Sequence, residues 1–139
     1  ATKLDTNGLR PRDLCALLDE GLLDYVAMDL KAPLDERYAT LSGCVVDLGR
    51  VRESMALLRE RAPAFEFRTT VAPPLSEADL RDLAEALLPT DLWYLQAYRE
   101  TPQVDPAYAG QQHLSEDELV EVVTALRESG WRVHVRGEE

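Results

Sequence analysis

Short apolar runs alternate with amphipathic stretches along most of the chain, and this alternation limits the fold more than any other feature of the sequence. Five runs are typical of β-strands: residues 2–5, 25–30, 65–71, 92–98 and 131–136. Four stretches between them repeat apolar residues at the three- and four-residue spacing of an amphipathic helix. This order predicts an α/β fold with a parallel sheet and right-handed crossovers, about five strands and four helices. The sheet is expected to be flat or curled into part of a barrel.

The helical stretches start at residues that favour helix beginnings. Pro11 suits a first turn, because its missing N–H would have no partner there. Ser76 and Ser115 each precede an acidic residue by three positions, which is the spacing of a capping box. After the second strand the sequence instead predicts a loop, through Pro33, Ser42 and Gly43.

Length and composition narrow the class of protein. The 139 residues, 45% of them hydrophobic, fit one domain over residues 1–139 with a real core. The formal net charge is −11 and no cluster of Lys or Arg is evident, so neither nucleic acid nor an anionic membrane is an expected partner. No apolar stretch approaches the length of a membrane helix and no signal peptide opens the chain, which predicts a cytoplasmic location. Cys15 and Cys44 lack metal-site spacing, so no metal site is expected.

Polar residues gather where the strands end. In parallel α/β folds, ligands bind beyond the carboxyl ends of the strands. Residues two apart in a strand point to the same face. The residues that therefore share faces at these ends are Asp5 with Asn7, Asp29 with Lys31, Glu66 and Arg68 with Thr70, and Gln96 with Tyr98. Four successive strands thus offer one polar, charged face, which favours a wide, incomplete barrel that holds a polar ligand over a barrel packed with aliphatic side chains.

Each of these features also has a purely structural interpretation. Asn7 with the glycine that follows it is common turn chemistry. Asp29 and Lys31 could form an internal salt bridge, and Arg68 could neutralise Glu66. One observation favours a role for Lys31: thirteen of the fifteen basic residues are Arg, so a compact ammonium at this position stands out.

Four segments, in order and spacing, carry a resemblance to a known family. They are "KLDTNG", "DYVAMDLKAP", "FEFRTTV" and "WYLQAYR". Together they resemble the radical S-adenosylmethionine enzymes that activate glycyl-radical enzymes, in particular the activating proteins of anaerobic ribonucleoside-triphosphate reductases. The resemblance covers essentially the whole chain and implies part of an incomplete (βα)6 barrel of the TIM type.

The resemblance implies that this part of the chain binds S-adenosylmethionine. It places Asp5 at the methionine ammonium group, Lys31 at the methionine carboxylate and Asp29 at the ribose. These pairings are chemically sensible, because a zwitterion needs an anion and a cation and a diol suits a carboxylate acceptor. The other cofactor-binding residues that it implies are Thr6, Asn7, Arg68, Thr70 and Arg99. Arg99 stands where related enzymes have a histidine near the adenine.

The family's [4Fe–4S] cluster is held by a CxxxCxxC loop, which this sequence does not contain. The chain resembles the third to sixth strands of the family's barrel with the C-terminal helix and strand, so it is expected to be a C-terminal fragment of a longer enzyme. The parent would be an oxidoreductase that uses the cluster to cleave S-adenosylmethionine and to generate a glycyl radical on an anaerobic ribonucleotide reductase. The fragment alone is expected to be inactive.

Two other classes of function remain open from the residues alone. One is a non-catalytic α/β binding domain. The other is a Schiff-base aldolase with Lys31 as the nucleophile, because a lysine at the end of a barrel strand is well placed for that role. The first strand is also expected to leave an unpaired edge, which predicts a homodimer through that strand.

Overall fold

The computed structural model describes residues 2–42, 45–72, 75–97 and 114–136. Its strands are β1 (Lys3–Thr6), β2 (Tyr25–Asp29), β3 (Phe65–Val71), β4 (Leu92–Ala97) and β5 (Arg132–Arg136). They form one sheet in the order β1-β2-β3-β4-β5, and every neighbouring pair is parallel. The predicted α/β fold, with strands ordered as they follow in the sequence, is confirmed.

Five helices connect the described strands: α1 (Pro11–Asp19), α2 (Arg37–Ser42), α3 (Leu48–Arg61), α4 (Glu77–Ala84) and α5 (Glu116–Glu128). Their beginnings confirm the sequence signals. Pro11 lies in the first turn of α1. Ser76 and Ser115 form complete capping boxes at α4 and α5, in which each serine accepts a backbone N–H and the acidic residue three positions on accepts the serine's own N–H.

Helix α2 corrects the prediction of a loop after the second strand, and it brings the helices of the described residues to five, where four were expected. It has only six residues, too few for an apolar stripe to show in the sequence. Such a short helix is not stable by itself. Here its Tyr38 is buried, and its Arg37 pairs with carboxylates of α4, so tertiary contacts stabilise it.

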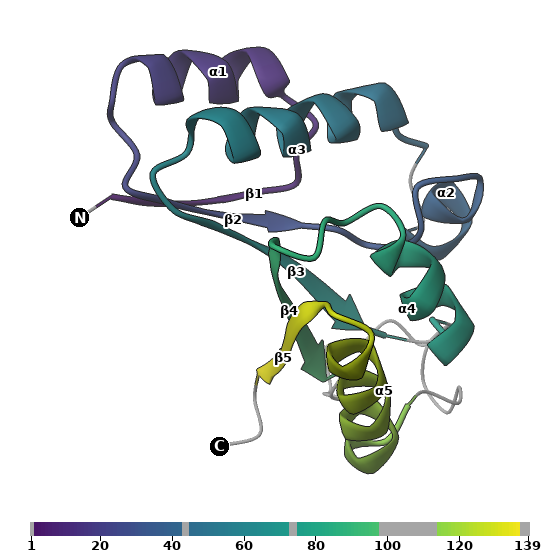
Figure 1. Cartoon of the computed structure of the whole chain (residues 1–139). Helices are drawn as coiled ribbons and strands as arrows, with labels where there is room; N and C mark the ends of the chain where they lie inside the picture. The colour runs from purple at the N-terminus through teal and green to yellow at the C-terminus, as the bar shows by residue number, and fades with distance from the viewer. Residues whose placement is uncertain (1, 43–44, 73–74, 98–113, 137–139) are drawn as a thin grey trace, which may run out of the picture.

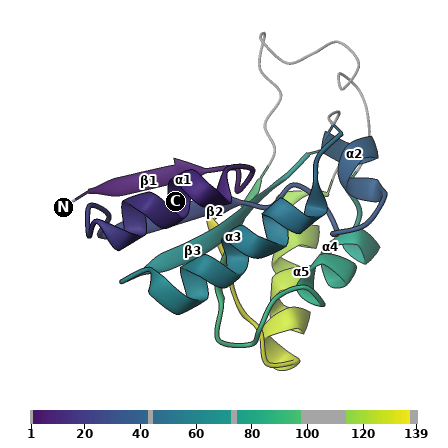
Figure 2. The ribbon, with the colours of Figure 1, turned by 90° about the horizontal axis from the view of Figure 1, so that it is seen from above.

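The helices cover one face of a strongly curled sheet. Figure 1 shows α1 and α3 side by side over β1 and β2, and α4 and α5 beside β3 to β5. The view from above shows the same arrangement (Figure 2). Alternate strand residues point under these helices and form the core with the helix stripes, among them Val26, Met28, Phe67, Trp93, Leu95 and Val133. The other strand residues line the opposite, concave face, on which no described helix packs.

The turn from β1 into α1 depends on Gly8. This residue has φ of +73°, and a Cβ placed there would come within 2.1 Å of the Met28 Cε atom. Its carbonyl accepts a hydrogen bond of 2.8 Å from the buried hydroxyl of Ser54 on α3. The close approach fixes where β1 ends.

Within the described residues, no helix is long and apolar enough to cross a membrane.

Candidate functional site

Three predicted site residues meet on the concave face of the sheet. Arg68 lies on the central strand β3, opposite Asp29 on β2. Its Nη2 atom is 3.2 Å from Asp5 Oδ1 and its Nε atom is 3.6 Å from Asp29 Oδ1. The side chains of the two aspartates, 63% and 45% exposed, open to solvent, whereas that of Arg68 is 19% exposed. We call Asp5, Asp29 and Arg68 the open cluster.

The open cluster has unused bonding capacity. The Arg68 Nε atom is buried without a hydrogen-bond partner, because its approach to Asp29 is too long to count as a hydrogen bond. The exposed carboxylates keep oxygen atoms that face water. A ligand can therefore bind these groups without first breaking a buried pair, since exposed ion pairs contribute only about 0–1 kcal/mol.

Lys31 follows the end of β2 and is exposed. Its backbone N–H donates a hydrogen bond of 3.3 Å to the hydroxyl of Tyr38. Within the described residues its ammonium group has no ion pair, and Asp29 pairs with Arg68 instead. The structural interpretation of Asp29 and Lys31 as a salt bridge is therefore wrong, because Asp29 pairs with the Arg68 guanidinium on the neighbouring strand.

Thr6 and Asn7 shape the turn after β1. Thr6 Oγ1 accepts the Gly8 N–H at 3.1 Å, and Asn7 Oδ1 accepts the Leu9 N–H at 3.0 Å. These bonds confirm the turn chemistry expected of Asn7. Thr70 is exposed on β3, beside Gln96 of β4. Arg99 and Tyr98 lie outside the described residues.

A second set of polar residues fills the deeper part of the concave face. Glu66 is buried, although it carries a carboxylate. The Tyr25 hydroxyl donates to Glu66 Oε1 at 2.6 Å, Arg136 Nη2 donates to the same oxygen at 3.2 Å, and Arg136 Nη1 lies 3.1 Å from Glu66 Oε2. We call Tyr25, Glu66 and Arg136 the buried network. The hypothesis that Arg68 neutralises Glu66 is wrong, because Arg136 does so from β5.

The buried network is held by more than charge. The Arg136 guanidinium lies 4.0 Å from the centre of the Tyr94 ring, within the range of a cation–π interaction. Burial and, next, the hydrogen bond to Glu66 raise the pKa of Tyr25 to about 12.

Sequence reasoning assigned no place in the site to Tyr25 or Arg136. The signal that could have placed them is the two-residue alternation, because each lies at an even spacing from other residues of the concave face.

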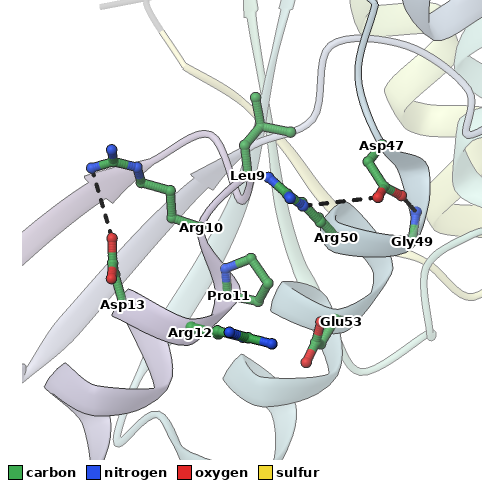
Figure 3. A pocket seen from close by; sticks show the side chains of 9 residues that line it. All are labelled: Leu9, Arg10, Pro11, Arg12, Asp13, Asp47, Gly49, Arg50 and Glu53. Carbon is green, nitrogen blue, oxygen red and sulfur yellow. Dashed lines mark hydrogen bonds and ion pairs between the residues drawn. The ribbon is translucent and has the colours of Figure 1, made fainter.

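A separate cavity of about 680 Å³ lies on the helix side, between the beginnings of α1 and α3 (Figure 3). None of the predicted site residues lines it. Arg10 pairs with Asp13 at 3.7 Å and Arg50 with Asp47 at 3.8 Å, so its charges balance within the cavity. The candidate site is therefore the concave face, which is open and not an enclosed cavity.

The described residues contain no group of three His, Cys, Asp or Glu side chains that could hold a metal ion. Cys15 lies on α1, where its Sγ atom is 3.3 Å from Arg61 Nη1 and 3.6 Å from Asp19 Oδ2. Cys44 is outside the described residues. The structure therefore assigns no metal ligands to the described part of the chain.

Comparison with known proteins adds a relative and a fold neighbour. No protein-family model matches the chain. The chain is 29% identical over 125 residues to a protein of Methanocaldococcus jannaschii that carries the provisional name of glycyl-radical enzyme activating enzyme. The match covers 86% of this chain and 52% of the relative, so the chain spans about half the length of that protein.

The fold neighbour is a crystal structure of a domain of the pyruvate-formate lyase-activating enzyme from Bacteroides vulgatus. It superposes with a TM-score of 0.68 at 16% sequence identity and covers 98% of this chain and 81% of the neighbour. The curled, parallel α/β fold of this chain is thus similar to the fold of that domain.

Proposed function

We propose that this chain is the S-adenosylmethionine-binding part of a radical S-adenosylmethionine enzyme that activates a glycyl-radical enzyme. The 29% identity to a protein named as an activating enzyme supports this assignment. The four sequence segments described above favour an anaerobic ribonucleotide reductase as the partner. We also propose the cytoplasm as the location. We propose further that residues 1–139 form a single domain of a longer parent protein.

The observation that carries the proposal is the open cluster beside Lys31. Two carboxylates lie near the carboxyl ends of β1 and β2, the Arg68 guanidinium lies on β3 opposite the end of β2, and the Lys31 ammonium belongs to the segment just beyond β2. This donor set fits S-adenosylmethionine, which presents an ammonium, a carboxylate and a ribose diol. In this proposal Asp5 accepts from the ammonium, Lys31 pairs with the carboxylate and Asp29 accepts from the ribose.

The remaining residues shape the same site. Arg68 lies between the two aspartates and contacts each of them. Thr6 and Asn7 hold the turn that ends β1, and Thr70 offers a hydroxyl on the exposed end of β3. We propose Arg99 as an adenine contact from the sequence alone.

The bound cofactor would supply the radical chemistry, and the protein would supply binding and orientation. The chain itself does not fit a [4Fe–4S] cluster, because Cys15 and Cys44 cannot form a CxxxCxxC loop. We therefore propose that the cluster ligands belong to another part of the parent protein.

Titration of the chain with S-adenosylmethionine, followed by calorimetry, tests the proposal. Lys31→Ala should weaken binding about tenfold or more, because hydrogen bonds to charged groups contribute about 1.5–3 kcal/mol. Lys3→Ala is the matched control, since it removes the other lysine of the chain and should leave affinity unchanged. Equal affinity of both variants and the wild type would contradict the assigned role of Lys31.

Covalent trapping of a carbonyl compound on Lys31 by borohydride would favour the aldolase instead.

A further inference from the structure

We propose that Tyr38 is a positioning residue for Lys31, and that Arg37 holds Tyr38 in place by joining α2 to α4. The role in ligand binding rests on the proposed function, because it concerns the same cofactor site. The positioning of Lys31 itself does not depend on any ligand.

Lys31 lies just beyond the hydrogen bonds of the sheet. The last strand-type bond from this end of β2 is donated by the Leu30 N–H to the Arg68 carbonyl, at 2.8 Å. The next N–H along the chain belongs to Lys31, and it donates to the Tyr38 hydroxyl at 3.3 Å. Successive N–H groups of a strand point to opposite sides, so the Lys31 N–H faces the side of β1, which has already ended at Thr6. The Tyr38 hydroxyl supplies the acceptor there instead.

Tyr38 is well suited to hold this position. Its side chain is only 3% exposed, so the ring is fixed by packing. Burial raises the pKa of Tyr38, and the negative charge of Asp29 adds to this rise, so the hydroxyl stays protonated near neutral pH.

Arg37 connects the segment after β2 to the helix after β3. Its guanidinium binds Asp35 through Nε and Nη2, and its Nη1 atom lies 3.0 Å from Asp79 Oδ1 and 2.8 Å from Asp82 Oδ2. The second oxygen of Asp79 accepts the Ser76 N–H in the capping box of α4. Figure 1 shows the resulting proximity of α2 and α4.

Through this connection, the segment that carries Lys31 is joined to the helix that follows the Arg68 strand of the open cluster. Helix α4 follows β3, the strand that carries Arg68 and Thr70. A lysine ammonium sits on a long flexible stem, so only its backbone can be fixed in advance. Fixing that backbone lowers the ordering cost when a ligand binds.

The chain's two lysines make the inference directly measurable. Reductive methylation with a ¹³C-labelled reagent places methyl groups on Lys3 and Lys31 and keeps their charge. The amino terminus gives a third methyl signal. Tyr38→Phe keeps the ring in the core and removes only the hydroxyl. We expect a changed Lys31 methyl signal and amide exchange of Lys31 that is about 2- to 12-fold faster, as expected for the loss of one hydrogen bond. The signal of Lys3 should not change.

Tyr25→Phe is the matched control, because it removes a hydroxyl with a 2.6 Å hydrogen bond from the deeper part of the same face. It should leave the methyl signal and the amide exchange of Lys31 unchanged, even if it lowers the melting temperature of the protein more than Tyr38→Phe does. Arg37→Met should change the Lys31 signals in the same direction as Tyr38→Phe, and Arg37→Lys should restore part of the wild-type behaviour, because lysine keeps the charge but not the two-pronged contact.

The ligand arm uses S-adenosylmethionine itself. The concentration that half-saturates the change in the Lys31 signal should rise about 2- to 12-fold in Tyr38→Phe and stay constant in Tyr25→Phe. Wild-type exchange and signal of Lys31 in Tyr38→Phe would overturn the inference. A changed Lys31 in Tyr38→Phe, together with no response of the wild type to S-adenosylmethionine, would support the positioning role and contradict the proposed function.

Discussion

The concave face has two regions that use the same chemistry in opposite ways. In the buried network, Glu66 is 2% exposed and is paired with Arg136, while in the open cluster Asp5 and Asp29 are largely exposed around Arg68. Each region has an arginine on one strand, which faces one carboxylate in the buried network and two carboxylates on two other strands in the open cluster. The difference is depth, because the buried carboxylate has lost its water and depends on its partners.

The comparison separates stability from binding. A buried charge that loses its partner destabilises the fold, whereas an exposed charge is solvated again at little cost. We therefore expect the buried network to hold the curl of the sheet and the open cluster to be available to a ligand. Three predictions test this contrast and a fourth concerns the free edge of the sheet; they are ordered by the size of the expected effect.

The largest effect is expected from Arg136→Met. It leaves the Glu66 carboxylate buried with only Tyr25 as a partner, and the free energy of unfolding should fall by about 2–4 kcal/mol, somewhat less than for a fully buried pair because Arg136 is partly exposed. Urea unfolding followed by circular dichroism measures this. Adding Glu66→Gln to the variant should recover part of the lost stability, since burying a neutral amide costs less desolvation free energy than burying a carboxylate. A loss below about 0.5 kcal/mol would show that the network does not stabilise the fold.

A moderate effect is expected from Tyr25→Phe, about 1 kcal/mol at neutral pH, for the loss of one buried hydrogen bond. The raised pKa of Tyr25, about 12, adds a dependence on pH. The folded state holds this proton more tightly than the unfolded state, whose tyrosine pKa is about 10. The stabilisation is thus complete below pH 10 and is lost as the pH rises towards 12. The difference in stability between wild type and variant, measured at several pH values, should shrink over this range, and a constant difference would contradict the raised pKa.

Small effects on stability are expected from Asp5→Asn and Asp29→Asn, below about 1 kcal/mol each, because both side chains are substantially exposed. Both should nevertheless weaken binding of S-adenosylmethionine, since each removes an anionic acceptor. Thermal unfolding and calorimetric titration of the same samples separate the two quantities. A loss of stability as large as that of Arg136→Met would remove the distinction between the two regions.

The smallest effect concerns association. Strand β1 pairs only with β2 in the described sheet, and Thr2 directs its carbonyl towards β2, so the backbone of Lys3 points to the free edge. We predict a weak homodimer through this edge, seen as a mass in light scattering that rises with concentration. Lys3→Pro removes one edge N–H and should weaken the dimer without unfolding the sheet. A strict monomer at high concentration would contradict this prediction.

Local patterns were sufficient for much of the fold. The helix beginnings at Pro11, Ser76 and Ser115 were predicted because capping is decided within four residues of the chain. The strands and their order followed from the alternation of periodicities, since consecutive crossover units place neighbouring strands side by side. Helix α2 was missed, because its stability comes from contacts of Arg37 and Tyr38 that no local pattern shows.

The sequence by itself determined which side chains would share the concave face, because the two-residue period of a strand is a local property. It brought Asp5, Asp29, Lys31 and Arg68 to one end of the sheet. Only the tertiary structure decided the pairings: Arg136 with Glu66, 70 positions apart, and Arg68 with Asp5 and Asp29. The physical reason is that an ion pair depends on distances of a few ångströms, and these are set by the curl of the sheet across β3 to β5 and not by spacing along the chain.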